Sequence, residues 1–387
     1  MRTRQRIAKL LFGCVLGVLL VELGLWFFPR RLMPKLRILD RVYTARAAWE
    51  DMMVGDPYLG YKLKPNLDFL FPSEGRKIPV RTVSLGFDGI GFRDIGTAPP
   101  FDAIAVGDSF TFCDDNPVAG CWVHNLAQSA KISIATLGVN GYGTLNEARV
   151  LERYGPPLKP KLIVLAVYLN DFKDNVNFDA WTRSGTGNFW QWMGQRRGRS
   201  PLGRKVSRYS MIYRVVDAAW RSRGREIHPY QSGSLDFVFR IDGWWVDLIK
   251  GIEHDRGWQL MQKGLLDMRR TAAGMNANLV VVLIPAKEEV YWNIAKQFAP
   301  AADRGMDVDH PLAVVRRFCQ EEQIPTCEVT DALRQEAQRG VQLYHRISAH
   351  WNDAGNAVAA KAIDRCLADR GFLKGLGGAA HATVPAG

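Results

Sequence analysis

The predicted fold is organised around one stretch, Ala103-Ile104-Ala105-Val106-Gly107-Asp108-Ser109-Phe110-Thr111. Its apolar part is too short for a helix and predicts a buried strand. Gly107 permits a tight turn that a Cβ would hinder. A helix that begins near Ser109 would aim its first N–H groups at the hydroxyl, where they can hold a developing negative charge. The stretch therefore predicts a strand that delivers the Ser109 hydroxyl to the end of a sheet.

Strands and helices alternate on the C-terminal side of this stretch. Apolar runs predict strands at 103–107, 133–139, 162–168, 278–285 and 326–329. Helices are expected at about 120–131, 144–154, 257–274, 288–297, 310–322 and 353–367. Thr144 with Glu147 predicts a capping box, and Thr330 predicts another helix cap. This alternation indicates a three-layer α/β/α, flavodoxin-like fold with a parallel sheet of about five strands, in which ligands gather at the carboxyl ends of the strands.

Composition divides the 387 residues into five segments. We expect a basic N-terminus at 1–6, a transmembrane anchor at 7–28, a juxtamembrane link with an extended lead-in at 29–100, the α/β domain at 101–370 and a disordered tail at 371–387. The α/β domain carries an insertion at 175–255 that is rich in Trp, Arg and Gly. We expect this insertion to be helical at about 209–221 and to form a lid or a membrane-facing flap.

The N-terminal apolar run is long enough for a bilayer, which needs about 20 such residues. Arg2, Arg4, Arg6 and Lys9 lie at its start, and only Glu22 interrupts it after Lys9. Phe27-Phe28-Pro29-Arg30-Arg31 resembles an aromatic belt followed by a stop, with no cleavage site after the run. We therefore expect a single-pass protein of the inner (cytoplasmic) membrane, with its body in the periplasm or another extracytoplasmic space.

The formal net charge of +12 is concentrated in one segment. Residues 196–225 hold ten Lys or Arg and one acid, Asp217. No zinc finger, RNA-recognition signature or helix-turn-helix accompanies them, so we expect no nucleic-acid partner. Two interpretations stay open: a basic surface loop, or a contact with anionic lipid or polysaccharide.

The six cysteines show no C-x-x-C spacing of a zinc site. Cys113 and Cys121 bracket the turn-rich loop Asp114-Asp115-Asn116-Pro117, and Cys319 and Cys327 lie between a helix and the next strand. Each pair is either a disulfide or two free thiols.

Three further stretches carry residues suited to acyl chemistry: Gly138–Thr144, Tyr168–Asp171 and Ser348–Asn356. Ser109 is the candidate nucleophile and His350 the candidate base, because imidazole titrates near neutral pH. The backbone N–H groups of Ser109 and Gly141 and the side-chain amide of Asn170 are candidate oxyanion donors.

Together, Gly107-Asp108-Ser109, Gly141, Asn170-Asp171 and His350-Trp351-Asn352 resemble the SGNH (GDSL-type) hydrolase superfamily over about residues 101–368. The lead-in motifs Leu59-Gly60-Tyr61 and Gly91-Phe92-Arg93-Asp94 resemble its membrane-anchored bacterial branch. Leu283–Glu288 and the His-Trp pair resemble alginate-type O-acetyltransferases. The resemblance implies acyl-ester chemistry with no cofactor, whether metal or nucleotide.

One position departs from this pattern. The superfamily places an acid two or three residues before the histidine, where this chain has Ser348 and Ile347. Ser348, Asp353 and Asp171 are the candidates to orient His350. Tyr168 replaces the glycine of the third block.

The leading hypothesis is a serine-dependent hydrolase of an O-acylated carbohydrate or other cell-envelope ester. An O-acyltransferase that modifies exopolysaccharide would use the same acyl-serine. A non-catalytic polysaccharide-binding envelope component and a lipid esterase with Phe189, Trp190 and Trp192 at the bilayer are the remaining alternatives.

Overall fold

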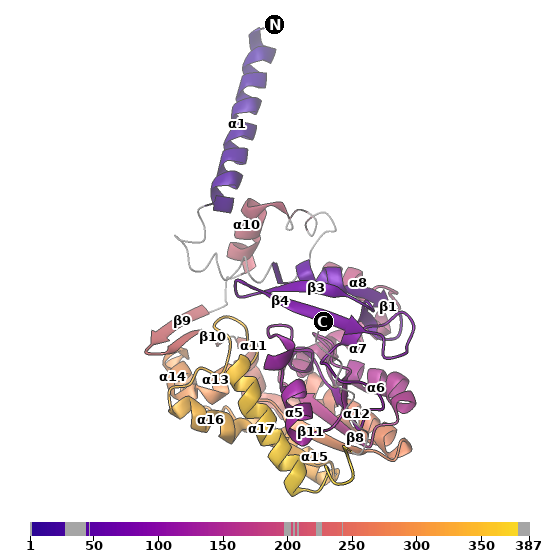
Figure 1. Cartoon of the computed structure of the whole chain (residues 1–387). Helices are drawn as coiled ribbons and strands as arrows, with labels where there is room; N and C mark the ends of the chain where they lie inside the picture. Colours follow the sequence, from indigo (N-terminus) through magenta and orange to yellow (C-terminus); the bar gives the residue numbers. More distant parts are fainter. Residues whose placement is uncertain are drawn as a thin grey trace. The chain divides into compact units, whose positions relative to one another are not determined.

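The computed structural model describes residues 2–27, 44–45, 47–196, 203, 206, 209–221, 227–241 and 243–377. The chain divides into two compact units (Figure 1). One comprises Met1–Asp51 with Gly194–Arg225, and the other comprises Met52–Met193 with Glu226–Gly387. Residues 28–31 of the predicted stop, part of the basic segment 196–225 and the tail beyond 377 lie outside the described residues.

A five-stranded sheet forms the centre of the larger unit. Its strands are β6 (Ala103–Val106), β7 (Ile134–Thr136), β8 (Leu162–Val167), β11 (Asn278–Leu283) and β12 (Thr326–Glu328). They lie in the order β12-β11-β8-β6-β7 and every neighbouring pair is parallel. The side chains of β6 and β8 are buried throughout, as expected for strands covered on both faces. The sequence-based prediction of a five-stranded parallel sheet is confirmed, and its strand order is the flavodoxin-like one.

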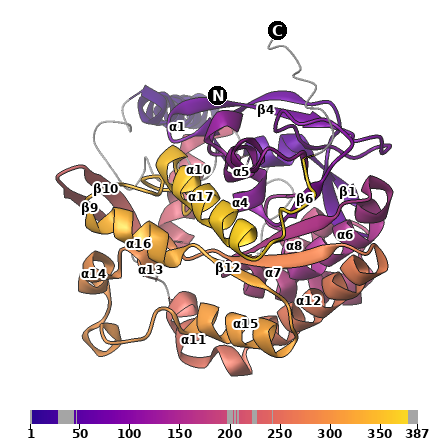
Figure 2. The ribbon, with the colours of Figure 1, turned by 60° about the horizontal axis from the view of Figure 1, so that its bottom comes forward.

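Helices pack in groups beside this sheet (Figure 2). α5 (Trp122–Ala130) packs against α17 (Asp353–Asp369), and α12 (Arg256–Gly274) packs against both α6 (Thr144–Leu158) and α7 (Asn170–Ser184). Four further helices follow β11 along the chain: α13 (Lys287–Val290), α14 (Trp292–Ala295), α15 (His310–Glu321) and α16 (Thr330–Gln338). The predicted helices near 120–131, 257–274, 310–322 and 353–367 thus match within a few residues.

Two helix starts differ from the prediction. Thr144 and Thr330 are the first helical residues rather than caps, and the cap positions belong to Gly143 and Val329. The Glu147 carboxylate is buried and has no hydrogen-bond partner among the described residues, so it does not close a capping box. The preceding glycine can take this position because the side chain of Asn175 reaches in and accepts from the Leu145 N–H at 2.9 Å.

The lead-in folds as β-structure within the larger unit. β1 (Met53–Asp56) pairs with β2 (Gly60–Leu63), while β3 (Asp68–Ser73), β4 (Arg76–Val83) and β5 (Phe92–Arg93) form an antiparallel sheet. Glu74 and Gly75 connect β3 to β4 and both have positive φ, 44° and 89°. Such a two-residue turn matches the twist of a hairpin. Its tip approaches the candidate site described below.

The predicted insertion at 175–255 contains several elements, which fall in both compact units. Its start continues α7, and α8 (Phe189–Arg196) follows. The hairpin of β9 (Ile227–Ser232) and β10 (Leu235–Arg240) and the helix α11 (Gly243–Gly251) belong to the larger unit, whereas α10 (Met211–Arg221) belongs to the smaller one. The predicted helix at about 209–221 corresponds to α10.

The structure decides between the two alternatives left open for each cysteine pair. Cys113 and Cys121 form a disulfide. For the second pair neither alternative holds, because Cys327 forms a disulfide with Cys366 of α17 and not with Cys319. Cys319 is a free thiol, buried in α15, and this burial raises its pKa to about 12. Strand β12 packs on α17, which is why Cys327 meets Cys366.

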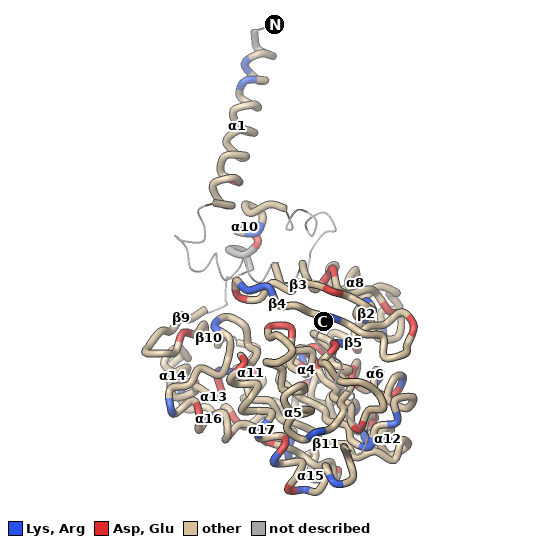
Figure 3. Tube along the Cα trace, viewed as in Figure 1, with Lys and Arg blue, Asp and Glu red and all other residues tan. Residues whose placement is uncertain are grey.

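In the smaller unit, α1 (Arg2–Phe27) includes a stretch from Gln5 to Phe27 that is long and apolar enough to cross a membrane. Its side chains are largely exposed. Its basic positions fall in the N-terminal part of the helix (Figure 3).

Candidate active site

Strand β6 delivers Ser109 as the sequence predicts. The helix α4 (Ser109–Phe112) begins directly after the turn, and Asp108 caps it by accepting the Phe110 N–H at 2.9 Å. Gly107 has φ 154°, and a Cβ there would lie 2.3 Å from Thr111 Oγ1. The turn therefore requires glycine. Ser109 lies at the N-terminus of a short helix, just beyond the carboxyl end of β6.

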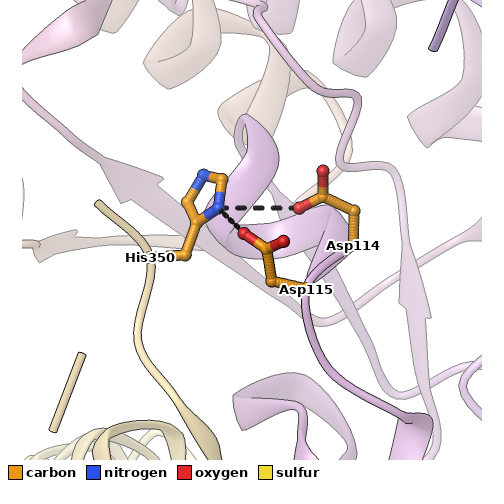
Figure 4. A group of neighbouring side chains, drawn as sticks. All are labelled: Asp114, Asp115 and His350. Atoms are coloured by element: carbon orange, nitrogen blue, oxygen red, sulfur yellow. Dashed lines mark hydrogen bonds and ion pairs between the residues drawn. The ribbon is translucent and has the colours of Figure 1, made fainter. Parts of the chain in front are cut away.

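Ser109, His350 and Asp115 form a continuous chain of hydrogen bonds. The Ser109 hydroxyl lies 2.7 Å from His350 Nε2, and His350 Nδ1 lies 2.5 Å from Asp115 Oδ2 (Figure 4). With Nδ1–H donated to the carboxylate, Nε2 presents its lone pair to the hydroxyl. This geometry is that of a nucleophile, a base and an orienting acid.

The carboxylate of Asp115 is held by two hydroxyl groups. Ser73, the last residue of β3, donates to Oδ1 at 2.5 Å, and Ser348 donates to Oδ2 at 2.7 Å. Burial by itself would raise the pKa of Asp115. The hydrogen bond and charge of His350, the charge of His345 and the Ser73 hydroxyl outweigh burial and hold that pKa far below its usual range. Asp115 is therefore ionised at neutral pH.

A second carboxyl group, that of Asp114, lies on the same side of the imidazole. Its Oδ1 is 3.6 Å from His350 Nδ1, and Asn140 donates to its Oδ2 at 2.9 Å. Oδ1 is buried and accepts no hydrogen bond from any described residue. Burial and the neighbouring charge of Asp115 raise the pKa of Asp114 to about 7.

These carboxylates change the basicity of His350. Burial would lower its pKa, but the hydrogen bond to Asp115 and the negative charges of Asp114, Asp115 and Asp108 raise it to about 9. The imidazolium form is thus strongly stabilised. That is the form a base takes after it has removed a proton from serine.

Asp114, Asp115 and His350 also have the donor types of a metal site. Two ligand atoms of a tetrahedral zinc, each about 2.1 Å from the ion, lie roughly 3.4 Å apart. The 2.5 Å between His350 Nδ1 and Asp115 Oδ2 is too short for this and suits a shared proton. The residues as arranged do not fit a tetrahedral zinc ion.

The loop that carries His350 is held from two sides. The Glu74 carboxylate at the hairpin tip accepts the backbone N–H groups of Arg346, Ile347 and Ser348, the first at 3.1 Å and the last at 2.8 Å. On the other side, the Lys287 ammonium donates to the carbonyl groups of His345 and Arg346 at 3.0 and 3.2 Å. The Glu74 carboxylate thus accepts from successive N–H groups of this loop, and the Lys287 ammonium donates to two of its C=O groups.

Lys287 is fully enclosed by this arrangement. It is 1% exposed, and burial lowers its pKa to about 8. Its ammonium also approaches the Val238 carbonyl of β10 at 3.4 Å. The hairpin β9–β10 is therefore linked to the His350 loop through one side chain.

An aromatic side chain next to the nucleophile supports the imidazole. Phe110 packs edge-on against the His350 ring at 5.0 Å between ring centroids, and against the Trp351 ring also at 5.0 Å. Tyr168, at the position where the superfamily has glycine, packs on Phe110 at 4.6 Å. This replacement thus fills space behind Phe110.

The other predicted site residues lie as follows. Gly141 has φ 75°, and a Cβ there would lie 3.0 Å from the Tyr61 hydroxyl, which itself donates to the Asn140 carbonyl. The Asn170 amide donates to Asp108 and Asp174, both at 3.0 Å, so in this structure both its N–H groups point at carboxylates. Gly141 and Asn170 stay candidate oxyanion donors.

Of the three candidates to orient His350, only Ser348 contacts it, at 2.9 Å from Nδ1. Asp353 instead accepts from Asn116 at 2.6 Å. Asp171 is buried, and neither of its carboxylate oxygens has a hydrogen-bond partner among the described residues. Burial and the charges of Glu147, Asp108 and Asp174 raise its pKa well above the usual range.

Sequence reasoning missed Asp115, Asp114, Glu74, Ser73 and Lys287. A signal for the first two was present, because an acid pair follows the nucleophile in a loop bracketed by Cys113 and Cys121. That loop leaves the same strand end as Ser109. Glu74-Gly75 was recognisable as a turn, but nothing local shows what a turn contacts.

The C-terminal part of the chain matches a known family. Residues 251–387 match the family described as ALGX: SGNH hydrolase-like domain, acetyltransferase AlgX. No curated protein matches the chain. The resemblance to the SGNH superfamily and to alginate-type acetyltransferases is therefore supported in the part that carries His350 and Lys287.

Several solved structures match the chain at low identity and low TM-score. A protein of the G-D-S-L family from Desulfitobacterium hafniense DCB-2 has a TM-score of 0.37 and 12% identity, with 68% of this chain and 98% of that chain covered. The acetyl xylan esterase AlAXEase has a TM-score of 0.38 and 12% identity, covering 67% and 96%. A variant of Axe2, an acetyl-xylooligosaccharide esterase from Geobacillus Stearmophilus, has a TM-score of 0.37 and 12% identity, covering 70% and 95%.

Proposed function

We propose that this chain is a serine-dependent acyl-ester enzyme of the SGNH superfamily, with an AlgX-like C-terminal part, and that it forms an acyl-Ser109 intermediate. The observation that carries this proposal is the hydrogen-bonded chain Ser109 Oγ, His350 Nε2, His350 Nδ1 and Asp115 Oδ2, with distances of 2.7 and 2.5 Å. Ser109 is the nucleophile, His350 the base and Asp115 the acid that orients the base.

In the first half of the reaction, His350 Nε2 takes the proton of the Ser109 hydroxyl while Oγ attacks the acyl carbonyl. The resulting oxyanion is held by the N–H groups of Ser109 and Gly141. Collapse expels the alcohol oxygen, which takes the proton back from the His350 imidazolium. The products of this half are the free alcohol and an acyl ester on Ser109.

In the second half, His350 deprotonates an incoming hydroxyl that attacks the acyl-Ser109 carbonyl. Collapse breaks the bond between the acyl carbon and Ser109 Oγ, and Oγ takes the proton back from the His350 imidazolium. Water gives hydrolysis, and a sugar hydroxyl gives acyl transfer. We propose hydrolysis as the leading activity, and transfer is the second candidate because the matching family is described as an acetyltransferase.

For the substrate we propose an O-acylated carbohydrate or another ester of the cell envelope. The support for a carbohydrate is the match to the family of acetyltransferase AlgX. Tyr61, whose hydroxyl faces Gly141, is buried and packs against Trp190 of α8 at 4.7 Å between ring centroids, so these rings form packing beside Gly141. Phe189 is buried in this group, which favours packing over lipid contact for that side chain.

For localisation we propose that α1 anchors the chain in the inner (cytoplasmic) membrane with the body outside the cytoplasm. The length and apolar character of Gln5–Phe27 and the basic residues at its start support this orientation. The two disulfides are of the kind that persist in an oxidising compartment.

Labelling by a fluorophosphonate probe tests the nucleophile without knowledge of the substrate. We expect the full chain in detergent to be labelled and Ser109→Ala to be unlabelled. Ser129→Ala, a change at a serine that only bonds to its own helix, serves as the matched control and should be labelled like the wild type. Equal absence of labelling and of p-nitrophenyl acetate turnover in wild type and Ser109→Ala would remove the proposal.

The partition of the acyl-enzyme separates the two candidate activities. With p-nitrophenyl acetate as donor, release of p-nitrophenol is measured together with the acetate formed and the acetyl groups recovered on an added oligosaccharide. Hydrolysis predicts one acetate for each p-nitrophenol. Transfer predicts that acetylated oligosaccharide replaces acetate. Saccharide binding without any turnover, unchanged in Ser109→Ala, would instead favour the non-catalytic envelope component.

A further inference from the structure

The helix α10 is connected to the apolar helix α1 by one carboxylate. Glu22 of α1 accepts hydrogen bonds from the Ser210 hydroxyl at 3.0 Å and from the backbone N–H groups of Met211 and Ile212, the latter at 3.1 Å. The Trp26 indole also donates to Glu22, at 3.1 Å. The carboxylate of α1 therefore caps the N-terminus of α10.

The position of Glu22 fixes the depth of this contact. Glu22 precedes Phe27 by five residues, which at 1.5 Å per residue is about 7–8 Å along the helix axis. If Gln5–Phe27 crosses a bilayer with Trp26 and Phe27 at the headgroups, Glu22 lies at the boundary with the acyl chains. A carboxylate at that depth is costly unless it is paired. The first turn of α10 supplies the pairing groups, and α10 must then lie at the same depth.

The surface of α10 suits that environment. Its polar residues Arg214, Asp217 and Arg221 recur at helical spacing, and most of its other positions are apolar. Met211 and Arg214 are buried, and the Arg214 guanidinium lies 5.6 Å from the Trp26 ring centroid. In contrast, Val216 of α10 is 61% exposed, and Tyr209, which lies two residues before the helix, is 74% exposed. The helix thus has one side toward α1, whereas the apolar side chain of Val216 is largely uncovered among the described residues.

The charge of the surrounding sequence indicates which kind of surface α10 binds. Residues 196–225 hold ten basic residues and one acid. An amphipathic helix with basic flanks next to a membrane span is the combination that anionic lipid attracts. We propose that α10 lies in the interface of an anionic bilayer beside α1, with Glu22 as the point that holds it there.

A fluorophore at position 216 tests this proposal in the full chain. The variant Val216→Cys in a Cys14→Ser background is labelled with an environment-sensitive dye and placed in nanodiscs that contain anionic lipid. Labelling is specific because Cys319 is buried and the other four cysteines are in disulfides. We expect brominated lipid to quench this dye by about twofold or more, as for an interfacial helix. The matched control Asp68→Cys, at an exposed position of β3, gives the level of quenching for an exposed side chain of the larger unit.

Two further samples separate the parts of the proposal. A dye on the native Cys14 reports insertion of α1, and it should be quenched. Glu22→Leu makes α1 more apolar, so the Cys14 dye should stay quenched while quenching at position 216 falls to the level of the Asp68→Cys control. Quenching at 216 that is unchanged by Glu22→Leu would overturn the role of Glu22.

The remaining outcomes overturn the proposal as a whole. Position 216 unquenched while Cys14 is quenched means that α10 leaves the bilayer. No quenching at Cys14 means that α1 does not span it, and the proposal falls with the anchor. Protection of the 216 dye by an anionic polysaccharide instead of by lipid would assign this surface to that partner. All these results are independent of turnover at Ser109.

Discussion

Asp115 Oδ2 lies 2.5 Å from His350 Nδ1, although 235 positions separate the two residues in the chain. The acid comes from the loop that follows the nucleophile helix α4, and the base comes from the loop before α17. Both loops meet at the carboxyl ends of the parallel strands. The acid missing beside His350 in the sequence is therefore supplied by a different segment.

We predict that Asp115→Asn lowers kcat by about 10³-fold or more, because removing the orienting acid costs about 10⁴-fold in an unrelated serine protease. Turnover of p-nitrophenyl acetate measures the effect. Asp68→Asn, at an exposed carboxylate of β3, should change turnover by less than about twofold. If Asp115→Asn keeps activity within about tenfold of wild type, Ser348 alone orients the imidazole and our assignment is wrong.

The second prediction concerns pH. His350 acts as a base only when it is neutral, and its pKa in the folded protein is raised to about 9. We therefore expect kcat/KM to rise with pH and to level off only above about 9. Asp114→Asn removes one of the negative neighbours that raise this pKa, so the rise should move to lower pH. The measurement is the pH profile of kcat/KM for both proteins, and a wild-type plateau that already begins near neutral pH would contradict it.

A third prediction follows from the contact of Glu74 with the His350 loop. Glu74→Gln replaces one of the accepting oxygens by an NH₂ group that faces backbone N–H groups. We expect kcat to fall by at least about tenfold with little change in KM, because the base is displaced and not the substrate. Lys77→Ala, an exposed change on the same hairpin, is the matched control. If Glu74 had a purely structural role, Glu74→Gln would lower the melting temperature but leave kcat unchanged at a temperature where the variant is folded.

A fourth prediction compares the two disulfides. Cys113–Cys121 closes the loop that carries Asp114 and Asp115, with a sequence separation of 8, whereas Cys327–Cys366 closes a separation of 39. Chain entropy assigns about 2.5 kcal/mol to the shorter loop and about 4 kcal/mol to the longer one. We expect the double Cys-to-Ser variant at 327 and 366 to lose more thermal stability.

The corresponding variant at 113 and 121 should lose more kcat, because its loop positions the acid. Melting curves and turnover measured on both variants check this crossed pattern. Equal kcat in the two variants, at a temperature where both are folded, would show that the disulfide next to the acid does not hold it in place.

Local patterns were sufficient for much of the fold. Buried apolar runs at 103–107 and 162–168 have few alternatives to strands, and alternation with helices implies a parallel sheet. The helix caps were less predictable. Thr144 and Thr330 have suitable side chains, but at the start of α6 it is the Asn175 side chain of α7 that accepts the Leu145 N–H. The partner of Cys327 depended on which helix covers β12, and no spacing rule contains that information.

Residue type and local backbone pattern were enough to propose the turn at Gly107-Asp108-Ser109 for the nucleophile and His350 for the base. The contact of Asp115 with His350, and the hydrogen bonds by which Glu74 and Lys287 hold the His350 loop, follow from the tertiary structure alone. The physical reason is that a hydrogen bond needs two atoms within about 3 Å, whatever their separation along the chain. In a parallel sheet, segments hundreds of residues apart end at the same edge.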